Sequence, residues 1–289
     1  MTGRVRGILF LLGFLFLWAV VEMLGAMVLE RYSALQVVWT RYLVHLLLLM
    51  AIFAWREPVG LIRTRRPVYQ LLRSMMMLVM PLSWVLATRM HSEAVVYGGF
   101  WSAPFLIIAL SALFLGERPR WELWVAATVG GLAAAAIFSG VVMPSLTEWL
   151  PLIGMTASFS IYVVMTRSLR HESTRTNLFY TALGVFVALT PVMPMVWQMP
   201  SLADLPIIAG IGGLGLVALW FLDVATASAP LKDTAPLILA QVPLALSLGW
   251  IAEHHFPDRR TLFYLTAVCL ACITPFIRIR FGFRARESQ

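Results

Sequence analysis

Three ionisable side chains lie inside long apolar runs of this 289-residue sequence, and their types suit the handling of a charged small molecule or a proton. Glu22 lies in the first apolar run, and Arg41 and His45 lie one helical turn apart in the second. Residues four apart share one face of a helix. A carboxylate and a guanidinium can bind opposite charges, and a carboxylate or an imidazole can also exchange a proton.

Glu22 and Arg41 are equally distant in sequence from the turn near Arg31, so antiparallel helices place them at one depth, roughly 10 Å from their outer ends. An ionised side chain at the bilayer centre costs at least about 2.5–3.5 kcal/mol, and it normally faces the protein interior. We therefore expect a direct ion pair, or a pair bridged by a polar ligand. Three roles stay open: a structural clamp, binding of a substrate's charged group, or proton coupling through Glu22. His45 is either a neutral, hydrogen-bonded core residue or a proton relay or ligand contact.

A second group of candidates is aromatic or polar. Tyr97 and Trp101 are four residues apart on one helical face, and Gln241 is a polar residue within a later apolar run. These side chains either line a central cavity or pack between helices with hydrogen bonds to their neighbours. The complete set of expected substrate-binding residues is Glu22, Arg41, His45, Trp84, Tyr97, Trp101, Ser102 and Gln241.

Other chemistries find little support in the sequence. Cys269 and Cys272 lie three apart in an apolar run without histidine beside them, which is typical of an inert buried pair. His254 and His255 are adjacent and lack the four-residue spacing of a helical zinc pair, so no metal site is expected. A phosphate-binding GxxxxGK[ST] loop does not occur, and we expect no cofactor and no catalytic residue.

Arg73 and Asp223 are predicted near the cytoplasmic ends of their helices. They could form a gate pair, but the preferred interpretation is that both side chains extend to the membrane interface.

These residues must be positioned by membrane helices. The chain is 60% hydrophobic and 12% charged, whereas an average soluble domain is about 25% charged. The net charge of +8 comes without a basic, aromatic patch, so nucleic acid is not an expected partner. Windows of about the 20 apolar residues that cross a bilayer predict helices at 7–29, 34–54, 69–89, 93–115, 121–141, 149–167, 177–197, 206–228, 232–252 and 261–280.

Lysine and arginine residues are unevenly distributed between the loops on the two sides of the predicted spans. Seventeen lie on the side of both chain ends and four on the other, with Arg41 inside the membrane. Cytoplasmic loops carry the excess of basic residues. The sequence therefore predicts a multi-pass protein of the cell inner membrane with both termini cytoplasmic and an even number of spans.

The two halves of the chain resemble each other. A shift of 139 residues places "YGGFWSAPFLIIALSALFLGERPRWELW" on "PLILAQVPLALSLGWIAEHHFPDRRTLF", with Pro104 on Pro243 and Ser102 on Gln241. Five helices per half, an odd number, invert the second half relative to the first. The expected fold is an all-α integral membrane protein with ten transmembrane helices in two inverted five-helix repeats, residues 1–143 and 144–289. Such repeats are typical of secondary transporters, with a substrate site near the midplane.

The segment "SAPFLIIALSALFLGERPRWELWVAATVGGLAAAAI" resembles the fourth and fifth helices of EamA-type members of the drug/metabolite transporter superfamily. The shared pattern is a proline, a Gly-Glu pair and a glycine-rich helix, here Pro104, Gly116, Glu117, Gly130 and Gly131. Arg41 and "LLRSMMMLVMPLSWVLA" also match, and the resemblance covers nearly the whole chain. The nearest branch includes S-adenosylmethionine-like and riboflavin-like uptake carriers, which usually have aspartate at Glu22 and often an aromatic residue at Leu239.

The residues and the resemblance together predict a secondary active transporter. It would move a small organic metabolite, such as an amino acid, a vitamin or a nucleoside-like compound, by alternating access. The alternative is a membrane-embedded enzyme, which would need acid, base or metal ligands clustered at one depth. The expected partners are a small-molecule substrate and the lipid bilayer. Protons as the coupling ion, a homodimer, the direction of transport and the identity of the substrate all stay open.

Overall fold

The computed structural model describes residues 3–54, 58–91, 93–137, 149–253 and 258–284, and the regular elements in these ranges are all helices. His254 and His255 lie outside the described residues. Among the described residues, six helical segments are long and apolar enough to cross a membrane. They are α1 (Gly3–Leu29), α2 (Ala34–Leu49) with its π-helical end (Met50–Ala54), α4 (Pro67–Met90), α8 (Trp149–Ser168), α9 (Thr174–Leu189) continued by η2 (Thr190–Val192) and α10 (Met193–Val196), and α11 (Leu205–Ser228).

The remaining helices are shorter or end near residues that are not described. They are α3 (Pro58–Ile62), α5 (Glu93–Phe100), α6 (Ala103–Leu115), α7 (Trp121–Ile137), α12 (Leu231–Thr234), η3 (Ala235–Ala240), α13 (Gln241–Glu253) and α14 (Arg259–Arg284). Each of the ten predicted windows falls on one or more helices, so the all-helical membrane class is confirmed. The count of ten spans stays a prediction.

Two of the predicted windows contain a break that the apolar pattern did not indicate. The window 93–115 is divided at Trp101 and Ser102, and the window 232–252 begins as a short α-helix and a 3-10 helix before α13. Proline has no N–H and clashes with the carbonyl four residues earlier. Pro104 lies in the first turn of α6, and Pro243 lies in the first turn of α13. The breaks therefore occur at equivalent places in the two halves.

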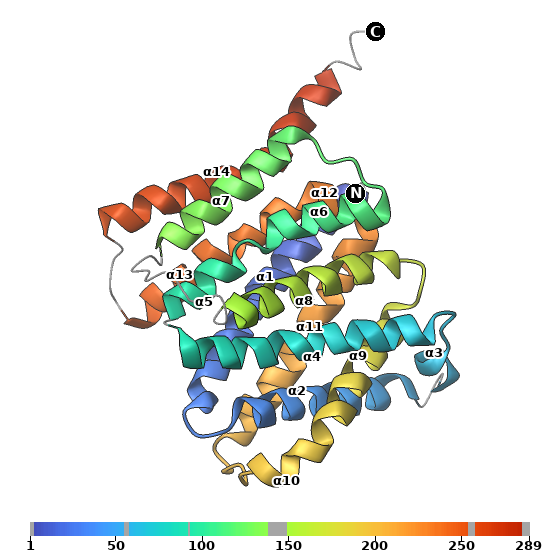
Figure 1. The fold of residues 1–289 in the computed structure, drawn as a ribbon. Helices are drawn as coiled ribbons and strands as arrows, with labels where there is room; N and C mark the ends of the chain where they lie inside the picture. Colours follow the sequence, from blue (N-terminus) through green and yellow to red (C-terminus); the bar gives the residue numbers. More distant parts are fainter. Residues whose placement is uncertain (1–2, 55–57, 92, 138–148, 254–257, 285–289) are drawn as a thin grey trace.

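The long helices pack in pairs that bring distant parts of the chain together. The most extensive contacts join α1 to α11, α4 to α8, and α7 to α14, and further contacts join α2 to both α9 and α11. In Figure 1, α7 and α14 run side by side at one edge of the bundle, while α2, α9 and α10 form the opposite edge. The protein is thus one bundle in which helices of the first half pack against helices of the second.

Glycines allow several of these close approaches. A Cβ built at Gly212 of α11 would lie 2.4 Å from the Cβ of Val44 of α2, and one at Gly7 of α1 would lie 2.5 Å from the Cβ of Ala229. Small residues at helix–helix contacts are typical of membrane proteins, where van der Waals packing drives association.

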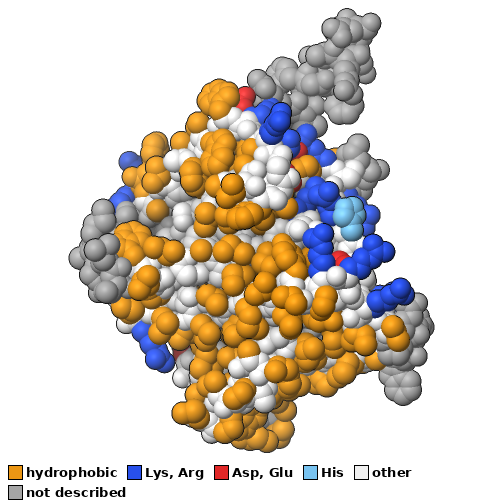
Figure 2. Space-filling model, turned by 45° about the vertical axis from the view of Figure 1, so that its right-hand side comes forward, with side chains coloured by type: hydrophobic (Ala, Val, Ile, Leu, Met, Phe, Trp, Pro, Cys, Tyr) orange, Lys and Arg blue, Asp and Glu red, His pale blue; other side chains and the backbone are white. Residues whose placement is uncertain are grey.

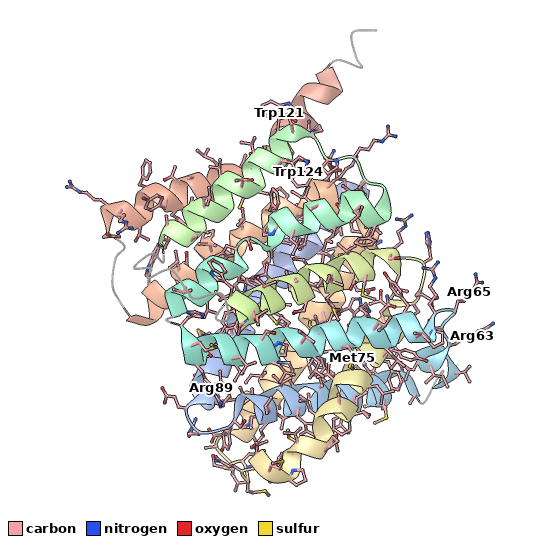
Figure 3. All side chains as sticks on the ribbon, viewed as in Figure 1. Arg63, Arg65, Met75, Arg89, Trp121 and Trp124 are labelled. Carbon is pink, nitrogen blue, oxygen red and sulfur yellow. The ribbon has the colours of Figure 1, made fainter. Side chains whose placement is uncertain are left out.

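The surface has the polarity expected of a membrane protein. Figure 2 shows hydrophobic side chains over most of the visible face, with basic side chains gathered along its edge. A soluble monomer rarely exposes a continuous apolar surface of this extent. Arg63 and Arg65 lie at one end of α4 and Arg89 at the other, as Figure 3 shows, so the helix axis separates the two polar ends by about 36 Å. The chain is a multi-pass membrane protein.

We predict that Gly212→Ala destabilises the bundle by about 1–3 kcal/mol, because the new methyl group overlaps Val44 and forces α2 and α11 apart. Thermal unfolding of the detergent-solubilised protein measures the effect. Gly213→Ala is the matched control, since its Cβ would meet no atom within 4 Å, and alanine favours helix over glycine. Equal melting temperatures for the two variants would contradict the packing described here.

Candidate functional site

Glu22 of α1 is held by two neutral N–H donors. Trp18 Nε1 donates to Glu22 Oε1 at 2.9 Å, and Gln241 Nε2 donates to Glu22 Oε2 at 3.1 Å. Trp18 lies one turn earlier on the same helix, while Gln241 comes from the start of α13, 219 residues away in sequence. The break before α13 therefore places a polar amide against the acid of the first helix.

Arg41 makes no direct ion pair with Glu22, so the first of the two expected arrangements does not hold, and a pair bridged by a polar ligand stays a prediction. Its Cζ lies over the ring of Trp18, 5.5 Å from the centroid, in a cation–π arrangement. Trp18 thus interacts with both charged groups, because its N–H donates to the carboxylate while its ring face contacts the guanidinium. Glu22 and Arg41 still attract each other electrostatically. Each oxygen of the carboxylate already accepts one N–H donor, and the guanidinium lies over the indole ring instead of on the carboxylate.

Three buried nitrogen atoms of the candidate residues have no hydrogen-bond partner among the described residues. They are Arg41 Nε, His45 Nε2 and Trp101 Nε1. Arg41 and His45 share one face, as predicted, and both lie against Gly215 of α11. A Cβ at Gly215 would be 3.2 Å from His45 Nε2 and 3.6 Å from Arg41 Cδ. A buried polar group without a partner costs about 1–3 kcal/mol, so these atoms suit a ligand or water that supplies the missing bond.

His45 is buried, with its ring against Tyr42 at a centroid distance of 5.0 Å. The ring makes a hydrogen bond with the backbone of Gly212, as expected of a hydrogen-bonded core residue, while its Nε2 has no partner. A ligand contact or a relay role therefore stays open for this nitrogen.

The aromatic candidates meet at a residue that sequence reasoning missed. Phe100 contacts Trp84 at a centroid distance of 6.2 Å, Trp101 at 5.6 Å and Phe159 of α8 at 5.2 Å. Trp101 is 2% exposed, so it belongs to the interior and not to an interfacial belt. The side chain of Tyr97 lies outside the described residues. An aromatic residue directly before the tryptophan was the available signal for Phe100.

Ser102 lies apart from the other candidates. Its side chain is exposed, and its hydroxyl donates to the carbonyl of Gly99 at 2.8 Å. The hydroxyl thereby closes the turn at the helix break. Its counterpart in the second half, Gln241, is buried and reaches Glu22. The two matched polar residues thus have different local roles, and the one that contacts the charged group is Gln241.

Leu239, where the resembling branch often has an aromatic residue, is fully buried in η3. A Cβ at Gly130 of α7 would lie 2.4 Å from Leu239 Cδ1. The leucine fills the space above that glycine, so it acts as a packing residue between η3 and α7.

A buried polar network that sequence reasoning underestimated lies toward the basic end of the bundle. Arg73 is 1% exposed and donates to Thr166 at 3.1 Å, to Thr181 at 2.9 Å, and to the carbonyl of Asn177. The expectation that Arg73 extends to the interface was therefore wrong. Five polar acceptors on α4, α8 and α9 offset the cost of burying the guanidinium. They are Gln70, Tyr162, Thr166, Asn177 and Thr181.

Asp223 joins the same network and does not extend to the interface either. It accepts hydrogen bonds from Asn177 Nδ2 at 2.9 Å and from the hydroxyl of Thr174 at 2.6 Å. Asn177 also accepts from Gln70 Nε2 at 2.6 Å, so one amide links α4, α9 and α11. The sequence signal for this cluster was the spacing of polar residues three or four apart, which puts Gln70 and Arg73 on one helix face and Asn177 and Thr181 on another.

The opposite end carries a second polar cluster around Asp204. Its carboxylate accepts from Tyr32 and Ser201, both at 2.7 Å, and pairs with Arg31 at 2.8 Å. These contacts join the turn between α1 and α2 to the segment that precedes α11. The hydrogen bonds from Tyr32 and Ser201, assisted by the charge of Arg31, lower the pKa of Asp204 below its ordinary value.

A group with a lowered pKa in the folded protein stabilises it above the unfolded pKa, near 4 for aspartate, and this contribution disappears as pH falls through the folded value. We predict that Asp204→Asn lowers the melting temperature at neutral pH, and that its difference from the wild type narrows on acidification below about pH 4. Tyr32→Phe, which removes one donor and keeps the charge, should show a smaller loss. A pH-independent difference would contradict this role of the carboxylate.

Comparison with known proteins relates this chain to a family of transporters. Residues 5–139 match the model of the EamA-like transporter family. The S-adenosylmethionine uptake transporter of Rickettsia felis is 23% identical over 233 residues, which is 80% of this chain and 79% of that protein. The transporters of the same name from Rickettsia conorii and Rickettsia prowazekii are 24% and 23% identical over 202 residues, 70% of this chain and 69% of theirs.

One solved structure, described only as the crystal structure of a protein, superposes with a TM-score of 0.80 over 94% of this chain and 96% of that one, at 15% identity. That likeness shows the fold alone. The family match and the curated relatives concern transporters and not enzymes. Residues 5–139, which carry Glu22, Trp18, Arg41 and His45, therefore match an EamA-like transporter family domain, and the chain as a whole is similar to these transporters.

Proposed function

We propose that this protein is a secondary active transporter that moves a small, zwitterionic organic metabolite across the cell inner membrane by alternating access. The observation that carries the proposal is the group of Glu22, Trp18, Arg41 and Gln241 in the bundle interior, beside nitrogen atoms that have no partner. Charged and unsatisfied groups at membrane depth typically mark a substrate or ion pathway.

The packing supports an arrangement in two inverted five-helix repeats, residues 1–143 and 144–289. In this arrangement α1 corresponds to α8, and α4 corresponds to α11. The repeat then relates the contact between α1 and α11 to the contact between α8 and α4. Both contacts are among the most extensive in the bundle. The last helices of the two repeats, α7 and α14, correspond to each other, and they also pack against each other. The helix breaks after Trp101 and after Ala240 match under the same correspondence. Broken helices at matched places, with the site between the repeats, are typical of secondary transporters.

Two polar clusters at opposite ends suit the two gates that alternating access requires. The cluster of Arg73, Asn177 and Asp223 joins α4, α9 and α11 at the basic end. The cluster of Tyr32 and Asp204 joins the turn after α1 to the start of α11 at the other end. Both clusters connect one half of the chain to the other, so rocking of one repeat against the other would break one of them at a time. The basic end is proposed to face the cytoplasm, as the distribution of lysine and arginine favours.

The chemistry of the site favours a substrate that carries both charges and a flat ring. Arg41 can bind a carboxylate through guanidinium N–H groups, and Glu22 can bind an ammonium or sulfonium group. Trp18 provides aromatic surface beside Arg41, and Trp101, a further candidate residue, has an unpartnered indole N–H. S-adenosylmethionine, the substrate in the names of the relatives, has all of these features, and amino acids and nucleoside-like compounds share some of them.

Sealed proteoliposomes test the transport proposal directly. We expect concentrative uptake of radiolabelled S-adenosylmethionine, or of an amino acid or nucleoside from the same screen, when a proton gradient or a counter-substrate is applied. Uptake that never exceeds that of empty liposomes, for every compound and gradient, would overturn the proposal.

Arg41→Gln should weaken apparent substrate affinity about 10- to 150-fold, the equivalent of one lost hydrogen bond to a charged group. Arg41→Lys keeps the charge but loses the planar contact with Trp18, so it should lie between the wild type and Arg41→Gln. Arg63→Gln, an exposed arginine at the basic end, is the control and should transport normally. A normal affinity for Arg41→Gln would remove Arg41 from the site.

Glu22→Gln tests proton coupling. We propose that protonation of Glu22 competes with its hydrogen bonds from Trp18 and Gln241 and thereby links substrate binding to pH. The variant keeps a similar shape and cannot titrate, so transport should lose its dependence on external pH. Glu30→Gln, which removes an exposed acid in the turn after α1, should leave the pH profile intact. If Glu22→Gln retains the wild-type profile, another group must carry the proton.

A further inference from the structure

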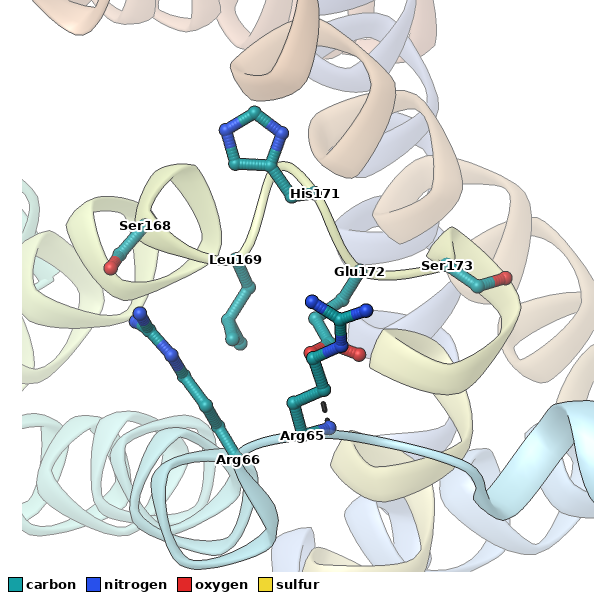
Figure 4. A pocket seen from close by; sticks show the side chains of 7 residues that line it. All are labelled: Arg65, Arg66, Ser168, Leu169, His171, Glu172 and Ser173. Carbon is teal, nitrogen blue, oxygen red and sulfur yellow. Dashed lines mark hydrogen bonds between the residues drawn. The ribbon is translucent and has the colours of Figure 1, made fainter.

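A pocket of about 460 Å³ lies outside the proposed transport site, between the start of α4 and the turn that joins α8 to α9. Figure 4 shows Arg65 and Arg66 on one side of it, and His171, Glu172 and Ser173 on the other. Its walls come from both halves of the chain. Neither the substrate group around Glu22 nor the network around Arg73 includes these residues, so the pocket needs its own explanation.

The charge of the pocket favours an anion. Arg65 and Arg66 contribute two guanidinium groups with exposed side chains. The one carboxylate in the lining, Glu172, is engaged by the backbone N–H of Arg65 at 3.2 Å (Figure 4). His171 Nε2 accepts from Arg170 at 3.2 Å, which leaves its other ring nitrogen able to donate. The lining therefore has more donors and positive charge than its single acid can neutralise.

Two helix N-termini add to this preference. Arg66 is the N-cap residue of α4, which has 24 residues, and Ser173 is the N-cap residue of α9, which has 16. Neither N-terminus has a hydrogen bond from its capping side chain. Uncapped N-terminal N–H groups and the helix dipole both attract anionic groups, phosphate in particular. Two N-termini and two arginines on one pocket form a combination that a phosphate group would satisfy.

The surroundings indicate that the phosphate belongs to a lipid. Val68 and Leu72, one turn apart at the start of α4, are 68% and 52% exposed, and Ile62 of α3 is 55% exposed. An acyl chain can lie on this apolar surface while its headgroup enters the pocket. We propose that the pocket binds the headgroup of an anionic phospholipid. The proposal relies on the orientation given above, in which this end meets the anionic cytoplasmic leaflet.

A lipid bound here would also act on the proposed inner gate. The pocket joins α4 to the connection between α8 and α9, and Gln70 and Asn177 link the same helices about one turn deeper. A headgroup that bridges Arg66 and Ser173 would stabilise the closed arrangement of this end. Anionic lipid would then favour the conformation described here over one that opens to the cytoplasm.

Thermal unfolding of the delipidated protein in neutral detergent, with native mass spectrometry of retained lipid, tests the site. Phosphatidylglycerol should raise the melting temperature of the wild type and remain bound, whereas phosphatidylcholine should not. The double variant Arg65→Gln/Arg66→Gln should lose most of the shift. Arg63→Gln/Arg118→Gln removes two exposed arginines from outside the pocket lining and should keep the shift.

Ser173→Asp provides a second variant that should fold at least as well as the wild type, because aspartate is a good N-cap residue. Its added negative charge should nevertheless reduce phosphatidylglycerol binding. Equal losses in the pocket variant and the control variant would show general electrostatic attraction and overturn the site. Equal stabilisation by inorganic phosphate at the same concentration would overturn the lipid assignment in favour of a free anion. Absence of any lipid effect on the wild type would overturn both.

Discussion

The indole of Trp18 allows opposite charges to lie together in the membrane interior without neutralising each other. Its N–H satisfies one oxygen of Glu22, and its ring face meets the guanidinium of Arg41. A buried ion pair in direct contact would satisfy both charges and leave neither for a ligand, while two unsupported charges would be too costly at this depth. The indole stabilises each charge in part and keeps both available. The proposed substrate site depends on this arrangement.

The helix breaks supply the remaining polar partners of the site. Pro104 and Pro243 interrupt their helices at matched places, which brings Trp101 inward in the first half and Gln241 against Glu22 in the second. Both halves have a helix break shortly before a proline, but the side chains at the two breaks differ. The residue at the first break is a buried aromatic side chain, and the residue at the second is a buried amide that binds Glu22.

The polar clusters at the two ends differ in how they are built. At the basic end, one deeply buried arginine is surrounded by neutral acceptors, and an asparagine connects it to Asp223. At the other end, Asp204 is held by two hydroxyl groups and an exposed arginine. The proposed lipid site lies at the same basic end as the first cluster, so membrane composition and the proposed gate closure would act on the same helices.

Composition and hydropathy were enough to determine the membrane class and the approximate helix positions, because these follow from the local balance between transfer free energy and helix length. The same pattern singled out Glu22, Arg41 and His45 as side chains that are costly to place in a membrane. The depth match of Glu22 and Arg41 was also readable from sequence. The partners of those residues were not. Trp18 as intermediary, Gln241 as donor, and the burial of Arg73 depend on how helices far apart in sequence approach each other, and glycines such as Gly212 and Gly215 set those distances. Side-chain pairing is decided by tertiary packing over a few ångströms, and a one-dimensional pattern of polarity does not contain that information.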